Sequence, residues 1–290
     1  MVAPWISVTA SRVYYLDGPS DISWLKPDGS KGLATSIAVS ARQQVSFAVS
    51  SDDKLLAVSV LSYGPRPSCG NPCLIPTPFL GTQLSVGDLA GGRRTTIFTS
   101  ATVPEVPVGW NSGNLVVGVV PPNCCQSVTP SSFSVTEYHV VNPATGNRIW
   151  TVCPAPGHAL GHPQPGGSLC GSGKSDSGLT VQAWNGKSTS AGLTTHFYKG
   201  DGFLSPNGTK VAFSGSGVTV QEIRGRRIQL IGLGDVMGWF DSDHLAALSN
   251  NLETAELVLV DLRKAPDGLE ASFTRLPPLQ IVGVFPGGLD

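Results

Sequence analysis

Residues 202–216, GFLSPNGTKVAFSGS, have the sequence of a β-hairpin. An apolar strand leads into a Ser-Pro-Asn-Gly turn, in which Pro206 fixes φ of the first central position and Gly208 accepts a left-handed conformation. An alternating strand at 210–214 completes the hairpin. A two-stranded ribbon buries too little apolar surface to be stable alone, so a chain built from such hairpins has to stack them into a larger all-β body.

The hairpin pattern recurs along the chain, although several copies are degenerate. The six copies are residues 5–18, 45–60, 106–120, 159–173, 202–216 and 236–250. The first apolar residues after the six turns stand 34 to 60 residues apart, and the intervals contain a further alternating strand and a short outer strand. A repeat of this length predicts a unit of four strands, so the chain is predicted to contain six such units.

Four-stranded units arranged radially bury both sheet faces and leave only short edges exposed. The sequence therefore predicts an all-β fold: a single six-bladed β-propeller over residues 1–290, with four antiparallel strands in each blade. The approximate blades are residues 2–39 with 279–288, 44–100, 106–152, 158–197, 200–232 and 235–277. In this prediction the C-terminal run LQIVGVFPGG joins the N-terminal blade and closes the ring. The alternative is an extra strand packed on the last blade.

The composition agrees with a turn-rich chain and argues against several functions. The 290 residues include 35 glycines and 23 prolines, and no window shows a sustained helical period. The net charge is −1, with 19 lysines and arginines thinly spread, so we expect no nucleic-acid partner. No apolar run is long enough to span a bilayer, and glycine motifs for phosphate binding are absent. We expect a monomer without a cofactor or a bound metal.

Six cysteines form three pairs that are close in sequence and lie in Gly/Pro-rich loops. The pairs are Cys69 with Cys73, Cys124 with Cys125, and Cys153 with Cys170. Of the 15 pairings that six cysteines allow, we predict these neighbour disulfides. In the alternatives, the adjacent pair reaches two different loops, or four thiols bind zinc at a looser spacing than the usual Cys-x2-Cys.

Disulfides indicate an oxidising compartment, so we expect an extracytoplasmic protein that is secreted, periplasmic or on the cell surface. The N-terminus lacks the basic segment and apolar core of a signal peptide. We therefore expect that a signal or anchor has been removed from this chain, and a cytosolic start is the alternative.

Two runs resemble the repeat of a known family. SPNGTKVAF at 205–213 and SSDDKLLAV at 50–58 resemble the repeat of TolB-like propellers, which are related to the WD-repeat class. The resemblance covers most of the chain at the level of the repeat pattern, and it implies the propeller fold. It leaves the function open, because propellers serve as binding modules, scaffolds, hydrolases and lyases.

Two tryptophans occupy matching places in their hairpins and are candidate ligand-binding residues. Trp110 precedes Asn111 in VGWNSG, and Trp239 stands close to Asp241 in MGWFDS. An aromatic ring beside a polar group is typical of a carbohydrate or peptide site. The alternative is that each indole fills the space between two blades, because large aromatic residues dominate core packing.

His158 and His162 form the most suggestive local cluster and lie between two of the cysteines. Prolines on both sides forbid a helix here, so the spacing does not bring both imidazoles to one helical face. We predict a stapled loop with exposed or hydrogen-bonded histidines, of which His162 is a candidate ligand contact. A metal site would need a third ligand, such as His196, from another blade.

Two long insertions carry four of the cysteines. Residues 62–82 and 121–133 each follow the second strand of a blade, so we expect them to leave one face of the ring side by side. Loops on a rigid scaffold are frequent binding sites, and stapling lowers the ordering cost of binding. The alternative is that the disulfides serve only to protect long loops.

The function that follows is a binding or scaffold module for a protein, peptide or glycan, with no catalytic residue assigned. The alternative is a glycan-active hydrolase or lyase, which needs two carboxylates across a cleft. Its acids would come from Asp52, Asp53, Asp176, Asp241 and Asp243. A third possibility is a sensor or docking domain of a longer protein. A convergent cluster of acids, histidines or arginines would favour the enzyme, whereas acids scattered in turns favour the binding module.

Overall fold

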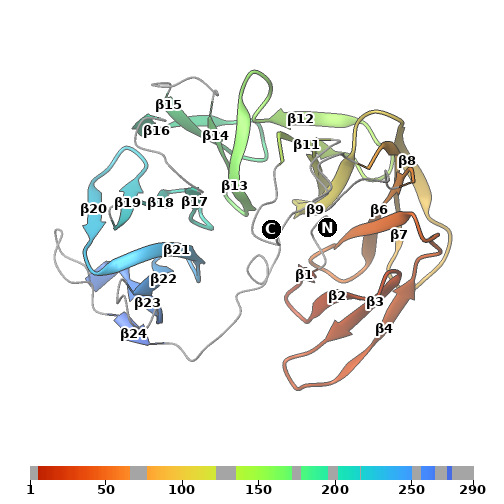
Figure 1. Ribbon diagram of the computed structural model, residues 1–290, viewed down its shortest axis with the longest axis horizontal. Coiled ribbons are helices and arrows are strands. Elements are labelled where there is room, and N and C mark those ends of the chain that lie inside the picture. The colour runs from red at the N-terminus through yellow and green to blue at the C-terminus, as the bar shows by residue number, and fades with distance from the viewer. Residues whose placement is uncertain are drawn as a thin grey trace. The chain divides into compact units, whose positions relative to one another are not determined.

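The computed structural model describes residues 6–65, 77–121, 135–171, 178–194, 202–215, 217–249, 256–264 and 273–275. Within these residues the regular structure is β-strand, apart from one 3-10 turn, η2 (Leu262–Lys264). The strands form six antiparallel sheets of four strands each (Figure 1). The prediction of an all-β chain with six four-stranded units is therefore confirmed.

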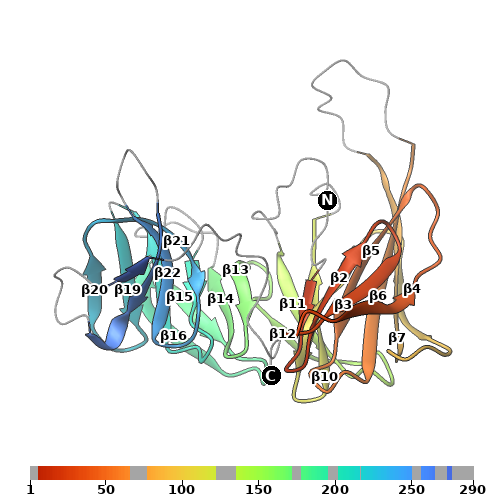
Figure 2. The same cartoon turned by 90° about the horizontal axis from the view of Figure 1, so that it is seen from below.

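Contacts divide the chain into two compact units, one up to Thr151 and one from Val152 onward, and each is described by itself. The first unit contains sheets 1 to 3. Their strands are β1 (Ile6–Val8), β2 (Val13–Asp17), β3 (Asp21–Leu25) and β4 (Lys31–Ser36); β5 (Gln43–Val49), β6 (Leu55–Tyr63), β7 (Phe79–Asp88) and β8 (Thr95–Ser100); β9 (Glu105–Asn111), β10 (Asn114–Val119), β11 (Glu137–Val141) and β12 (Arg148–Val152). Strands β6 and β7, of 9 and 10 residues, are the longest described and run side by side (Figure 2).

The second unit contains sheets 4 to 6. Their strands are β13 (His158–Gln164), β14 (Gly167–Gly171), β15 (Gly178–Gln182) and β16 (Ser188–Thr194); β17 (Gly202–Leu204), β18 (Lys210–Ser214), β19 (Val218–Glu222) and β20 (Arg227–Leu230); β21 (Leu233–Trp239), β22 (His244–Ser249), β23 (Leu257–Asp261) and β24 (Phe273–Arg275). In all six sheets, strands that follow one another in sequence are neighbours.

Side chains of the turns explain why the hairpins form where the sequence predicts them. In the turn between β17 and β18, the Ser205 hydroxyl accepts the N–H of Lys210 at 2.9 Å, and Gly208 has a φ of +71°. In the turn between β5 and β6, the Ser50 hydroxyl accepts the N–H of Leu55 at 2.8 Å. The serine at the start of each turn thus binds the first residue of the second strand, which fixes the hairpin register.

Apolar clusters fill the space between neighbouring sheets of the first unit. One cluster joins sheets 1 and 2, and it includes Tyr14, Ile22, Phe47 and Leu56. The hydroxyl of Tyr14 donates to the Asp53 carboxylate at 3.0 Å, which ties the two sheets together at their edge. Burial and this hydrogen bond raise the pKa of Tyr14.

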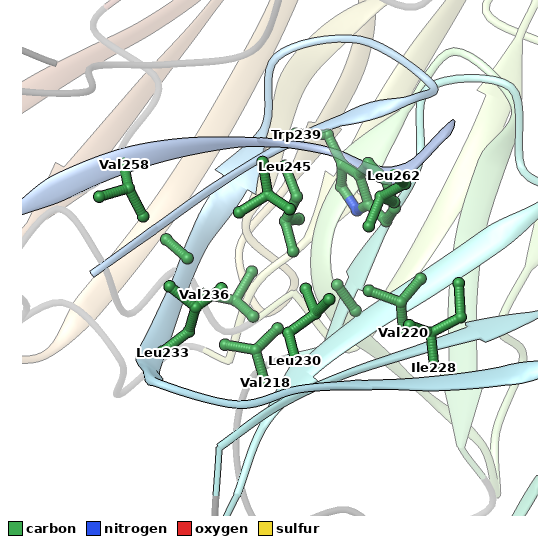
Figure 3. Close-up of a cluster of buried hydrophobic side chains, with 13 residues drawn as sticks. Val218, Val220, Ile228, Leu230, Leu233, Val236, Trp239, Leu245, Val258 and Leu262 are labelled. Atoms are coloured by element: carbon green, nitrogen blue, oxygen red, sulfur yellow. The ribbon is translucent and has the colours of Figure 1, made fainter. Parts of the chain in front are cut away.

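The second unit packs in the same way. One cluster joins sheets 4 and 5, and a larger one joins sheets 5 and 6 (Figure 3). The turns of sheets 4 and 5 also meet directly, because the N–H of Gly166 donates to the carbonyl of Pro206 at 2.6 Å. The Ser-Pro-Asn-Gly turn is therefore a packing element as well as a hairpin turn.

One disulfide is present in the described part of the chain and joins Cys153 to Cys170, as the sequence predicts. Both cysteines are buried. Cys170 lies on β14, so the expectation of a loop position is wrong for this residue. β14 pairs with both β13 and β15, which explains why it is extended although a glycine stands at each of its ends. Cys69, Cys73, Cys124 and Cys125 lie outside the described residues.

Replacing both Cys153 and Cys170 by serine is expected to lower the free energy of unfolding by about 3 kcal/mol, because the bridge closes a loop of 17 residues in the unfolded chain. Urea unfolding of the oxidised protein and the double variant measures this difference. An unchanged midpoint in the double variant would show that the bridge contributes nothing to stability.

Candidate functional site

Glu105, the first residue of β9, is the centre of a group of ionisable side chains, of which Glu105 and His139 are buried. Its carboxylate Oε1 lies 2.9 Å from Nδ1 of His139 and accepts a 2.6 Å hydrogen bond from Nη2 of Arg148. On the other side of the ring, Nε2 of His139 lies 3.0 Å from Oε1 of Glu137. Glu105 and His139 are almost fully buried, so their polar atoms are satisfied by these partners instead of by bulk water.

The main chain of Glu105 is held by the neighbouring sheet. Its carbonyl oxygen accepts hydrogen bonds from the hydroxyl of Ser59, at 2.7 Å, and from the hydroxyl of Thr82, at 3.4 Å. Ser59 lies on β6 and Thr82 on β7, so these bonds join sheet 2 to the start of sheet 3. The main chain of Glu105 therefore fixes the position of one end of sheet 3 against sheet 2.

The stems of two long connections lie at this same end, which we call the stem end of sheets 2 and 3. The N–H of Gly64 donates to the carbonyl of Pro78 at 2.8 Å, where the first connection joins β6 to β7. The N–H of Thr136 donates to the carbonyl of Val119 at 2.8 Å, where the second connection joins β10 to β11. One apolar cluster spans both stems and contains Leu61, Tyr63, Val106 and Val120, with Phe79 and Val108 packed against it.

Among the described residues, two large aliphatic side chains are exposed at the stem end. Leu80 on β7 is 58% exposed, and Val103, in the connection from β8 to β9, is 36% exposed. The N–H of Val103 donates to the hydroxyl of Ser100 at 2.8 Å, which holds this connection against the end of β8. Both side chains are thus carried by backbone that is fixed to sheet 2.

Trp110 lies at the opposite end of β9 from Glu105. Its side chain is in the apolar cluster between sheets 2 and 3, only 2% exposed, and its indole N–H donates to the carbonyl of Ala48 at 3.3 Å. Asn111 ends β9 and pairs with Asn114 across the turn. The Trp110 indole thus fills the space between two sheets, which is the alternative to a ligand role. A ligand role for Trp110 and Asn111 stays a prediction.

Trp239 is likewise packed between sheets 5 and 6 and is fully buried (Figure 3). Its indole N–H donates to the carbonyl of Phe203 at 2.8 Å. Asp241 follows in the turn and accepts from the N–H groups of Asp243, at 2.7 Å, and His244, at 2.8 Å. Burial raises the pKa of Asp241, but these N–H donors and the side chain of His244 together outweigh it and lower the pKa overall.

His158 and His162 both lie on β13. The expectation of a loop at this place is therefore wrong. The hairpin with β14 imposes the extended conformation, and a cis peptide bond precedes Pro156, just before the strand. The His162 ring stands 6.3 Å from the ring of Phe203 on β17. Its role as a ligand contact stays a prediction, and His196 lies outside the described residues.

The described acids that an enzyme would use lie in two turns, and each has its own partner. Asp52 and Asp53 share the turn between β5 and β6, and Asp241 and Asp243 share the turn between β21 and β22. Asp52 pairs with Lys54 at 2.9 Å, Asp53 accepts from Tyr14, and Asp243 pairs with Lys210 at 2.8 Å. Among the residues that the structure describes, no group of three His, Cys, Asp or Glu side chains is arranged to hold a metal ion. Asp176 lies outside this part of the chain.

Neither a protein-family model nor a curated protein matches the sequence. Solved structures do match. An oligogalacturonate lyase in complex with manganese has a TM-score of 0.58 and 9% identity, over 88% of this chain and 74% of that chain. An acylaminoacyl peptidase of Pyrococcus horikoshii has a TM-score of 0.55 and 14% identity, over 95% of this chain and 45% of that chain. A chain of a mitotic checkpoint complex has a TM-score of 0.54 and 14% identity, over 97% and 78%.

These matches and the six four-stranded sheets define the chain as a β-propeller protein. The resemblance of its repeats to TolB-like and WD-repeat-like propellers is thereby confirmed at the level of the fold. Residues 279–288 lie outside the described part, so closure of the ring by both chain ends, like the single-domain boundaries, stays a prediction. In the part that the structure describes, no helix has the length and apolar character needed to cross a membrane.

Proposed function

We propose that the protein is an extracytoplasmic binding or scaffold propeller, and that its ligand, a protein, peptide or glycan, binds at the stem end of sheets 2 and 3. The observation that carries the proposal is the shared apolar cluster beneath the two stems. It provides a rigid base for both long connections, and a rigid base lowers the ordering cost of binding. The buried disulfide supports the compartment, because such bonds persist where conditions are oxidising.

The stem end also fits binding better than catalysis. Its carboxylates, Glu105 and Glu137, are both directed at His139. A general acid or base has to reach the substrate, and almost complete burial keeps Glu105 from doing so. The described candidate acids Asp52, Asp53, Asp241 and Asp243 are each bonded to a partner in or beside their turns, so the enzyme alternative has no comparable support.

The test is a selection of ligands with the whole chain, from a random-peptide phage library and from a glycan array. Replacing residues 66–76 by a Gly-Ser linker of equal length is expected to weaken binding of the selected ligands by at least about tenfold, or roughly 1.4 kcal/mol. The matched control replaces residues 265–272 in the second unit and is expected to leave binding unchanged. Equal losses in both variants would contradict the proposed site, and turnover of a polysaccharide by the intact chain would favour the enzyme.

A further inference from the structure

The stem end carries very few charges. Within the described residues 36–43, 60–65, 77–82, 100–106, 119–121 and 135–137, the charged side chains are Arg42, Glu105 and Glu137. Both carboxylates are bonded to His139, and Glu105 also to Arg148. Arg42 is therefore the one described charge at this end that is not part of the Glu105 group, and it is exposed.

The aromatic side chains at this end are placed for packing instead of stacking on a sugar. Tyr63 and Phe79 form an edge-to-face pair with ring centroids 6.1 Å apart, and Tyr63 belongs to the buried cluster. A glycan site is usually built from an open aromatic face with convergent polar groups. The large apolar side chains that are exposed among the described residues here are instead aliphatic, Leu80 and Val103.

Two exposed aliphatic side chains, a low density of charge among the described residues and a buried apolar cluster are together typical of the centre of a protein–protein contact. Resting on the proposed function, we infer that the ligand of the stem end is a protein that presents an uncharged, apolar segment, and that Leu80 and Val103 are its contact residues. The apolar cluster of Leu61, Tyr63, Val106 and Val120 holds their backbone in place, so few side chains lose freedom on binding.

The experiment uses the full chain, with peptides from a random phage library and glycans on an array as the probes. The selected peptides are expected to be rich in apolar residues, and Leu80→Asp and Val103→Asp are each expected to weaken their binding about tenfold or more. Ile231→Asp is the control, because Ile231 is 61% exposed, close to the value for Leu80, and lies in the second unit. It is expected to bind like the unchanged chain. Circular dichroism confirms that each variant is folded.

Three results would overturn the inference, and they separate it from the proposed function. Selected peptides that bind both variants normally would show that Leu80 and Val103 are not contact residues. Glycans whose binding is lost in Leu80→Asp would preserve a binding site at the stem end but replace the class of ligand. No ligand from either library would contradict the proposed function together with the inference.

Discussion

Gly161→Ala is expected to lower the free energy of unfolding of the second unit by roughly 3 kcal/mol or more. A Cβ atom at Gly161 would stand 1.9 Å from the carbonyl oxygen of Gly202, where β13 approaches β17. Because the obstacle is backbone, no change of rotamer relieves the clash, and the two sheets have to move apart. The residue also has a φ of +68°, which a side chain disfavours.

Gly192→Ala is the matched control for this effect. Its φ is +71°, almost the same as that of Gly161, but no atom lies within 4 Å of a Cβ built there. The control is expected to cost only the conformational penalty, about 1 kcal/mol. Urea unfolding of both variants measures the difference. Equal losses of unfolding free energy in the two variants would mean that the clash between β13 and β17 adds nothing to the cost of the positive φ.

Glu105→Ala is expected to cost about 3 to 5 kcal/mol, because it removes the partner of Nδ1 of the buried His139 and leaves only Glu137 at Nε2. Glu105→Gln keeps the shape of the side chain and removes its charge. It is expected to be destabilising as well, since Arg148 and His139 then lose their shared ionic acceptor. Thermal unfolding of the two variants, followed by circular dichroism, gives both values.

An exposed ion pair provides the comparison. Glu222 and Arg226 are 3.3 Å apart and both side chains are substantially exposed, so Glu222→Ala is expected to cost less than about 1 kcal/mol. If Glu105→Ala cost no more than this variant, the side-chain bonds of the Glu105 group would not stabilise sheet 3. The binding experiments at the stem end would then need another explanation of its rigidity.

Local turn chemistry made most of the fold predictable from the sequence. A serine at the start of a turn, followed by Pro-Asn-Gly or Ser-Asp-Asp, determines both the hairpin and its register through the bonds at Ser205 and Ser50. The repeat of that pattern then determines the number of sheets. The pairing of Cys153 with Cys170 was predictable for a similar reason, since the two residues are close in sequence.

The candidate site was much less predictable, because its members are distant in sequence. Glu105 lies 34 residues from His139 and 43 from Arg148, and only the register of four strands brings them together. No local motif marks such a group. Trp110 and Trp239 illustrate a second limit: a tryptophan before a turn has the same sequence pattern whether its ring packs between sheets or faces a ligand.

The contact between the turns of sheets 4 and 5 determines where this scaffold tolerates grafted loops. A Cβ atom at Gly166 would stand 2.4 Å from the backbone nitrogen of Gly208, so each turn limits the size of the residues in the other. Gly113, in the turn between β9 and β10, has no atom within 4 Å of such a Cβ. A display library is therefore better inserted at Gly113, whereas an insertion at Gly166 would separate two sheets.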